Sequence, residues 1–241
     1  MKSFVITMSG DRDSVGLSHK LNQSIEDTQS NVQLETFEAV IPLTLNQRSF
    51  DLFGKTVPWT WPTRDEEDGM DHSLGMWKKT YPSTDQNRVK SCAVSHFELW
   101  KKCAEENVPY LILEHDAIFV KKFDPDNYVH KKWGVMGLND PRGNTRKGMR
   151  FNHLLEAQGK GIHDVPKIDF EGELPLPMGL AGNSAYMIKP HAAKKLLDKI
   201  EEIGMWPNDA IMCRQLFPGM IKVLYPYYTS TQRNVSSTTK S

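Results

Sequence analysis

An apolar strand runs straight into two carboxylates in the stretch Tyr110-Leu111-Ile112-Leu113-Glu114-His115-Asp116. In an open α/β sheet, ligands bind beyond the carboxyl ends of the strands. Glu114 and Asp116 are two positions apart. If the extended backbone continues, both side chains project to the same face and can converge on one hard cation, which could in turn hold a diphosphate. The alternative interpretation is a strand that ends in a solvated acidic turn.

The length and charge of the chain favour one α/β domain that acts on a small ligand. Its 241 residues exceed the usual domain size, yet single α/β domains often reach this length. Thirty basic and thirty acidic residues cancel, which argues against an extended basic surface for nucleic acid, although a local basic groove is compatible with this balance. We therefore expect a small polar or anionic substrate and no nucleic-acid partner.

The cysteines and the apolar runs indicate the compartment. Cys92, Cys103 and Cys213 are widely spaced and form no Cys-x-x-Cys pair, so neither a disulfide framework nor a zinc ribbon is indicated. A reducing compartment is expected. The first apolar run, at 3–8, is far too short for a signal or membrane segment, and no later run reaches about 18 residues. These features predict a cytoplasmic protein without a transmembrane segment.

Hydrophobic periodicity predicts alternating strands and helices. Besides the strand that begins at Tyr110, strands are expected at 3–8, 33–40, 133–138, 181–188 and 221–225. Helices are expected at 14–27, 88–106, 190–203 and 208–217. This order is typical of βαβ units with a mostly parallel sheet.

Two long stretches lack such periodicity. Residues 42–84 and 139–167 are rich in Pro, Gly, Trp and charged side chains, and structureless segments of this size are usually functional or mobile. We expect both to be irregular loops that become ordered when ligand binds. The Ser/Thr-rich residues 230–241 are expected to form a disordered tail after a single domain at 1–229.

Four motifs in a fixed order resemble glycosyltransferase family 25, which includes lipooligosaccharide and collagen galactosyltransferases. The motifs are Ser91-Cys92-Ala93-Val94-Ser95-His96-Phe97-Glu98-Leu99-Trp100, then Leu113-Glu114-His115-Asp116-Ala117, then Gly182-Asn183-Ser184-Ala185-Tyr186-Met187-Ile188 followed by Ala193-Lys194-Lys195-Leu196-Leu197, and finally Asp209. The resemblance spans roughly 4–225, and its most specific part is the Cys-x-x-Ser-His helix just before the acidic strand end.

The resemblance implies a single Rossmann-like GT-A domain, with a mostly parallel mixed sheet flanked by helices and two long irregular loops. It also implies an inverting transferase that uses a UDP-sugar donor and a divalent metal, Mn²⁺ or Mg²⁺. A hexose, galactose or glucose, would pass to a carbohydrate hydroxyl, as in lipopolysaccharide biosynthesis. A lipid-linked acceptor would bring the protein into peripheral contact with a membrane.

The resemblance and the chemistry assign roles to acidic and basic residues. Asp116, with Glu114 directly or through water, would hold the metal, and Arg12 is a candidate partner for the donor phosphates. Asp209 would be the general base, because the family carries a late acidic residue there and a helix start can position a carboxylate. The alternative for Asp209 is an ordinary helix cap.

Two residues of the Cys-x-x-Ser-His helix, Ser95 and His96, are assigned to the donor site by the resemblance. The alternative for His96 is a core histidine with satisfied hydrogen bonds. Cys92 and His96 have the i, i+4 spacing of a zinc pair, but the sequence shows no third or fourth ligand.

This chain departs from the family, because members usually carry Glu-Asp-Asp where it has Glu114-His115-Asp116. His115 either packs on the opposite face or adds a nitrogen ligand that favours Mn²⁺. The first strand also departs, since members usually end it in Asn-Leu followed by arginines, where this chain has Met8-Ser9-Gly10-Asp11-Arg12.

Aromatic and basic residues in the irregular stretches have two interpretations each. Trp59, Trp61 and Trp77 could stack on sugar faces, or they could cover the core. Arg142 and Arg146, with Lys147 and Arg150 nearby, could guide an anionic ligand or form a solvated face. A sugar- or nucleotide-binding module that has lost turnover is the alternative to an enzyme.

Overall fold

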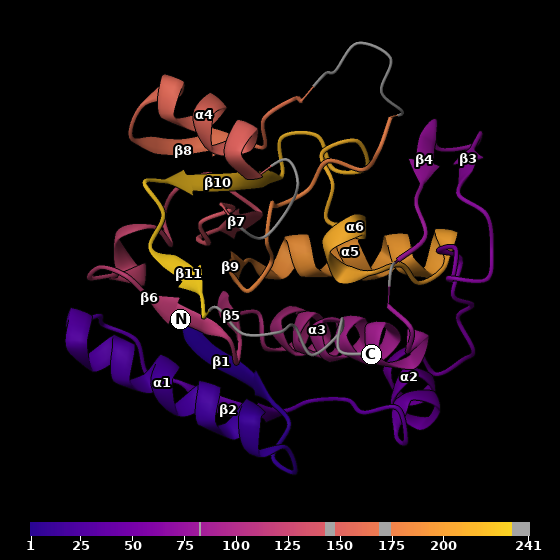
Figure 1. The fold of residues 1–241 in the computed structure, drawn as a ribbon, viewed down its shortest axis with the longest axis horizontal. Helices are drawn as coiled ribbons and strands as arrows, with labels where there is room; N and C mark the ends of the chain where they lie inside the picture. The colour runs from indigo at the N-terminus through magenta and orange to yellow at the C-terminus, as the bar shows by residue number, and fades with distance from the viewer. Residues whose placement is uncertain (82, 143–147, 169–174, 233–241) are drawn as a thin grey trace.

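A seven-stranded sheet forms the centre of the protein in the computed structural model, which describes residues 1–81, 83–142, 148–168 and 175–232 (Figure 1). Its strands, in spatial order, are β2 (Glu35–Glu38), β1 (Lys2–Thr7), β5 (Tyr110–Glu114), β9 (Ala185–Ile188), β7 (Val135–Gly137), β10 (Ile221–Tyr225) and β8 (Gly161–Asp164). β9 and β8 run antiparallel to their neighbours, and the other neighbouring pairs are parallel. The expected mostly parallel α/β sheet is therefore confirmed.

Helices cover both faces of this sheet. They are α1 (Arg12–Thr28), α2 (Leu45–Phe53), α3 (Gln86–Glu106), α4 (Gly148–Gln158), α5 (Pro190–Ile203) and α6 (Asn208–Ile211), with a 3₁₀ turn at Pro125–Asn127. α3 and α5 pack side by side, and α1 lies apart from them beside β6 (Figure 1). None of the helices in the described residues is long and apolar enough to cross a membrane.

Successive side chains of β5 point to opposite faces of the sheet and belong to two separate hydrophobic cores. The side chains of Tyr110 and Ile112 belong to the core that includes α3 and α5, whereas those of Leu111 and Leu113 belong to the core that includes Leu21 of α1. All five side chains are fully buried. A strand buried on both faces carries apolar or aromatic residues at every position, which is why the sequence from Tyr110 to Leu113 has no charged residue.

The prediction of two irregular loops is wrong in part. Residues 42–84 contain α2 and the hairpin of β3 (Gly69–Asp71) and β4 (Met76–Lys78), and residues 139–167 contain α4 and β8. The helix α2 buries only Leu45 and Leu52, and each hairpin strand has three residues. Elements this short give too few repeats for a helical or strand period to stand out.

Part of the first of these stretches is fixed to the chain that leads into α6. The amide of Thr60 donates to the carbonyl of Met205 (3.1 Å), and the Thr60 hydroxyl donates to the carbonyl of Ile203 (2.7 Å). The same hydroxyl accepts a hydrogen bond from the indole of the fully buried Trp206 (2.9 Å), which also packs edge-on against Trp61. These contacts hold the start of α6 in place.

Two further boundaries differ from the sequence analysis. The helix expected at 208–217 is the single turn α6, which ends at Ile211. The tail expected from Ser230 is wrong for its first residues, because Ser230 and Thr231 lie in β11 (Thr229–Thr231), paired with β6 (Ala117–Phe119). Residues 233–241 lie outside the described residues.

Replacing Thr60 by Val should lower the free energy of unfolding by about 1–3 kcal/mol, because the buried indole N–H of Trp206 loses its acceptor. Thr60→Ser keeps the hydroxyl and should cost much less. Chemical denaturation measures both values. Equal stability of the two variants would contradict this account of how α6 is held.

Candidate active site

The strand β5 ends at Glu114, and His115 and Asp116 form a turn that leads into β6. The extended backbone was expected to continue to Asp116, but it stops at Glu114, one residue after the apolar run. The two carboxylates still act on each other. Burial and the negative charge of Glu114 raise the pKa of Asp116 to about 7. The turn thus brings Asp116 close to the charge of Glu114.

A third carboxylate, that of Asp209, belongs to the same group. Asp209 is the second residue of α6, which packs against α3, and the cap position is occupied by Pro207 without a side-chain hydrogen bond. Asp209 is therefore not the helix cap. Burial and the charge of Glu114 raise the pKa of Asp209 above its ordinary value. The strand end and the helix start thus bring three acidic side chains within electrostatic reach.

The charges that act on these three carboxylates come from each other and from histidines. In the described residues, no lysine or arginine is among the groups that shift the pKa of Glu114, Asp116 or Asp209. The Oδ1 atom of Asp116 is buried and has no hydrogen-bond partner there. Carboxylate oxygens with little water and no cationic side chain fit a hard divalent cation.

His96 links Glu114 to the core. Its Nε2 atom lies 3.2 Å from Oε1 of Glu114, and its Nδ1 atom lies 2.8 Å from the hydroxyl of Tyr186. The indole of Trp100 donates to that same hydroxyl (2.7 Å). Burial acts to raise the pKa of Glu114, but the hydrogen bond from His96 and the attraction of His96 and His115 bring it below its ordinary value.

One arrangement of protons satisfies all four side chains of this hydrogen-bonded series, Trp100, Tyr186, His96 and Glu114. The Trp100 indole can only donate, so the Tyr186 oxygen accepts from it and donates its own proton to Nδ1 of His96. His96 then carries its proton on Nε2 and donates to Glu114. His96, Tyr186 and Trp100 are fully buried. The imidazole is therefore held in one tautomer, with its N–H directed at an ionised Glu114.

Ser95 and His96 have the surroundings of core residues. The Ser95 hydroxyl donates to the carbonyl of Ser91 (2.9 Å) and accepts from the amide of Val40 (2.8 Å), so it joins α3 to the segment after β2. Both ring nitrogens of His96 are also engaged within the protein. This geometry supports the core alternative for His96, with an effect on the site that passes through Glu114.

Cys92, His96 and Glu114 place one ligand atom each within 4.8 Å of one another. The third ligand that the sequence did not reveal is thus Glu114. However, burial and the charge of Glu114 raise the pKa of the Cys92 thiol well above its ordinary value, and zinc needs the thiolate. The described residues show no fourth ligand beside this group, so it does not match a closed structural zinc site.

Arg12 lies at the same sheet edge as Glu114, and His115 lies between Glu114 and Asp116 in the sequence. Arg12 is exposed at the first position of α1 and lines a hollow of about 370 Å³ with Ser9, Val15, Gly16 and His19. Because β1 pairs in parallel with β5, this turn lies at the same sheet edge as Glu114.

Burial lowers the pKa of His115, and a hydrogen bond with the backbone of Ile6 engages its ring, which favours the packing alternative over metal ligation.

Asn183 and Ser184, which the sequence analysis did not select, lie beside the acidic strand end. The amide of Glu114 donates to the carbonyl of Ser184 (2.8 Å). Both side chains are buried, and neither the Asn183 amide atoms nor the Ser184 hydroxyl has a hydrogen-bond partner among the described residues. A polar Gly-Asn-Ser run directly before a buried strand was the signal that could have identified them.

Trp61 and Arg142, one from each of the two long stretches, have structural contacts. Trp61 is buried, and its indole donates to the carbonyl of Lys79 (2.9 Å). Arg142 forms an ion pair with Asp140, with its NH2 atom 2.6 Å from Oδ2. Trp61 thus takes the core interpretation, whereas Arg146 and Lys147 lie outside the described residues.

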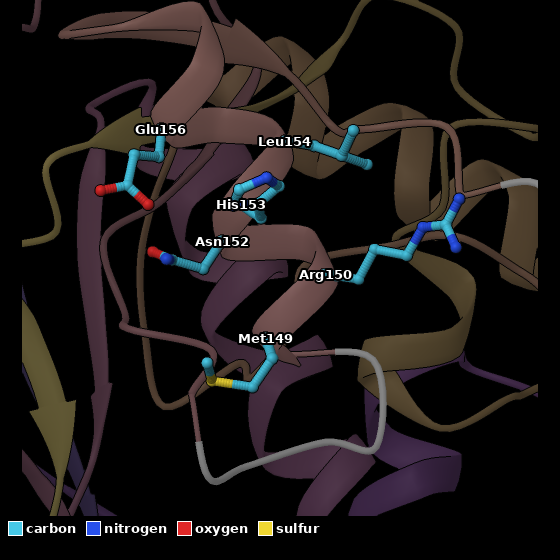
Figure 2. A pocket seen from close by; sticks show the side chains of 6 residues that line it. All are labelled: Met149, Arg150, Asn152, His153, Leu154 and Glu156. Atoms are coloured by element: carbon cyan, nitrogen blue, oxygen red, sulfur yellow. The ribbon is translucent and has the colours of Figure 1, made fainter.

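A hollow of about 590 Å³ lies along α4 and does not include these carboxylates. Figure 2 shows the side chains that line it, all from α4: Met149, Arg150, Asn152, His153, Leu154 and Glu156. Arg150, one of the basic residues that the sequence analysis named as possible guides for an anionic ligand, lines it, but none of the residues assigned there to the metal, the donor or the general base does. The carboxylate group, rather than this hollow, is therefore the candidate active site.

Tyr186→Phe should remove the donor to Nδ1 of His96 and the acceptor of the Trp100 indole. We expect a loss of about 1–3 kcal/mol in the free energy of unfolding, because two buried polar atoms lose their partner. The imidazole ¹⁵N resonances of His96 should also move toward a mixture of tautomers. Tyr110→Phe is the control, since the Tyr110 hydroxyl at the other end of β5 donates to Glu106 instead. Unchanged His96 resonances in Tyr186→Phe would refute the proton arrangement.

Comparison with known proteins gives a family for the chain. A family model described as glycosyltransferase family 25 (LPS biosynthesis protein) matches residues 2–212. No curated protein sequence matches the chain.

Two solved glycosyltransferase structures are similar at low identity. One is the apo form of GlyE from Streptococcus pneumoniae TIGR4, with 12% identity and a TM-score of 0.38 over 92% of this chain and 44% of that one. The other is the apo form of mouse xyloside xylosyltransferase 1, with 10% identity and a TM-score of 0.38 over 91% of this chain and 80% of that one. The chain therefore spans less than half the length of GlyE.

Proposed function

We propose that this chain, which belongs to glycosyltransferase family 25, moves a hexose from a UDP-sugar to a carbohydrate hydroxyl with inversion and requires Mn²⁺ or Mg²⁺. The observation that carries the proposal is that Glu114, at the carboxyl end of β5, lies within electrostatic reach of Asp116 and Asp209. Galactose and glucose are the proposed sugars. The acceptor is proposed to be a lipid-linked carbohydrate at the cytoplasmic face of a membrane, in keeping with the family description.

The metal is assigned to Asp116 and Glu114. The unpartnered Oδ1 of Asp116 and the ionised state of Glu114 support this assignment. When bound, the cation would supply positive charge to the departing diphosphate. Arg12, exposed at the same sheet edge, is proposed as a second cationic partner of the phosphates.

Asp209 is proposed as the general base. As the acceptor oxygen forms its bond to the anomeric carbon and the bond to the diphosphate breaks, the Asp209 carboxylate takes the acceptor proton. Burial and the charge of Glu114 raise the pKa of Asp209, which makes this carboxylate a stronger base than one in water. Attack on the face opposite the diphosphate inverts the anomeric configuration.

The metal assignment predicts that UDP binds only with a divalent cation and that Asp116→Asn weakens this binding about tenfold or more, because the amide removes ligand charge and keeps the shape. The folded state should not lose stability, since a carboxylate with a raised pKa is costly to bury in its charged form. Calorimetric titration of UDP with excess Mn²⁺ measures the change.

Asp198→Asn is the control for this titration, because Asp198 pairs with Lys194 on the exposed side of α5. It should bind UDP as the unaltered protein does. Equal affinity in Asp116→Asn would remove Asp116 from the metal site. Cation-dependent UDP binding without any transfer would instead favour a binding module.

The base assignment predicts that Asp209→Asn keeps UDP-sugar and metal affinity within about a factor of three but lowers transfer by ~10²-fold or more. Only the ionised form accepts a proton, so the rate of transfer should rise as pH increases through the raised pKa of Asp209. This rise in the transfer rate at the acidic side of the pH profile should disappear in Asp209→Asn. Near-normal transfer by the folded variant would exclude Asp209 as the base.

A further inference from the structure

The segment 179–184 is held between the two parts of the candidate active site. A side chain at Gly179 would lie 2.5 Å from the carbonyl oxygen of Met212 and 2.7 Å from that of Asp209, so this backbone packs directly on α6. At its other end, the Ser184 carbonyl accepts from the amide of Glu114 (2.8 Å). Asn183 therefore lies in a short segment anchored to the proposed base on one side and to the acidic strand end on the other.

Both polar atoms of the Asn183 side chain are buried without a hydrogen-bond partner among the described residues. The exposed fraction of Asn183 is 7%. Ser184 is 3% exposed, and its hydroxyl also has no partner there. A buried polar atom without a partner costs about 1–3 kcal/mol, so three such atoms in adjacent residues lower stability and call for a ligand that supplies their partners.

The chemistry of these atoms defines what they can bind. An amide offers one acceptor and two donated hydrogens, and a hydroxyl can donate and accept. Neighbouring hydroxyls on a sugar ring have the complementary pattern, because each both donates and accepts. A phosphate or carboxylate would match poorly, since it could only accept, and it would face the negative charges of Glu114 and Asp116.

We propose that Asn183 and Ser184 bind hydroxyl groups of the hexose that is transferred and so contribute to the choice of donor sugar. The inference rests on the proposed function, because the hexose of a UDP-sugar lies next to the diphosphate that Asp116 and Glu114 are proposed to hold through a metal. It goes beyond that function by naming the side chains that contact the sugar itself.

Stability and binding should change in opposite directions in Asn183→Leu. Leucine has the same number and branching of side-chain heavy atoms and introduces no unpartnered polar atom, so the melting temperature should stay equal or rise. The affinity for UDP-galactose or UDP-glucose, measured by calorimetry with Mn²⁺, should fall about tenfold or more, because sugar hydroxyls would then meet an apolar group. The affinity for UDP alone should change by less than about twofold. Ser184→Ala should show the same pattern to a smaller degree.

Asn139→Leu is the matched control. Asn139 is a buried asparagine at the same edge of the sheet, two residues after the end of β7, but its amide donates to the carbonyl of Asp140 (3.1 Å) and its Oδ1 lies 3.5 Å from the Thr229 hydroxyl. Its replacement should lower the melting temperature by roughly 3 °C or more.

The proposal is overturned if Asn183→Leu lowers the melting temperature as Asn139→Leu does, or if its UDP-hexose affinities equal those of the unaltered protein. Should Asn183→Leu fail to fold, Asn183→Ala is measured in its place with the same criteria. If the unaltered protein binds no UDP-hexose, the proposed donor is wrong. In that case, free galactose and glucose are titrated while the NMR signal of the Asn183 side-chain amide is followed, and an unmoved signal overturns the sugar subsite.

Discussion

Mutual repulsion among three partly buried carboxylates is the constraint around which the site is arranged. The charge of Glu114 contributes to the raised pKa of both Asp116 and Asp209. Like charges held together where water is scarce are costly. In the described residues, the positive charge that acts on this group comes from histidines, and the donated protons come from His96 and from backbone amides. The arrangement therefore favours a ligand that carries a cation, as the proposed metal-dependent transfer requires.

The rest of the fold can be understood as support for this group. Glu114 is fixed at the end of a central strand and receives a hydrogen bond from His96, whose orientation depends on Tyr186 and Trp100. Asp209 is placed by one helical turn that the Thr60 contacts hold against the core. Rigid positioning of this kind would keep the groups proposed to react aligned with one another.

Much of the scaffold could be predicted from the sequence, because long elements repeat their apolar pattern several times. The helix expected at 190–203 and the strand expected at 221–225 have the predicted bounds. The α2 helix and the β3–β4 hairpin were missed because each buries too few side chains to show a period. The membership of the family was also evident from ordered motifs, and the family model confirms it.

The site was harder to predict, because its contacts join residues far apart in the chain. His96 and Tyr186 are 90 positions apart. They meet because α3, which carries His96, packs on β5, and β9, which carries Tyr186, pairs with β5. No local spacing reveals that Tyr186 would orient the histidine. The turn at Asp116 was missed for a different reason: whether a strand continues past its last apolar residue depends on what the next segment pairs with, and here Ala117 begins β6.

Anomalous diffraction from a crystal that contains Mn²⁺ and UDP tests the central claim most directly. We predict one strong manganese peak within bonding distance of an Asp116 oxygen, with Glu114 as a direct ligand or one water away, and with the diphosphate on the opposite side of the ion. A manganese ion bound to the diphosphate but remote from Asp116 and Glu114, or bound at Cys92 and His96, would contradict the account.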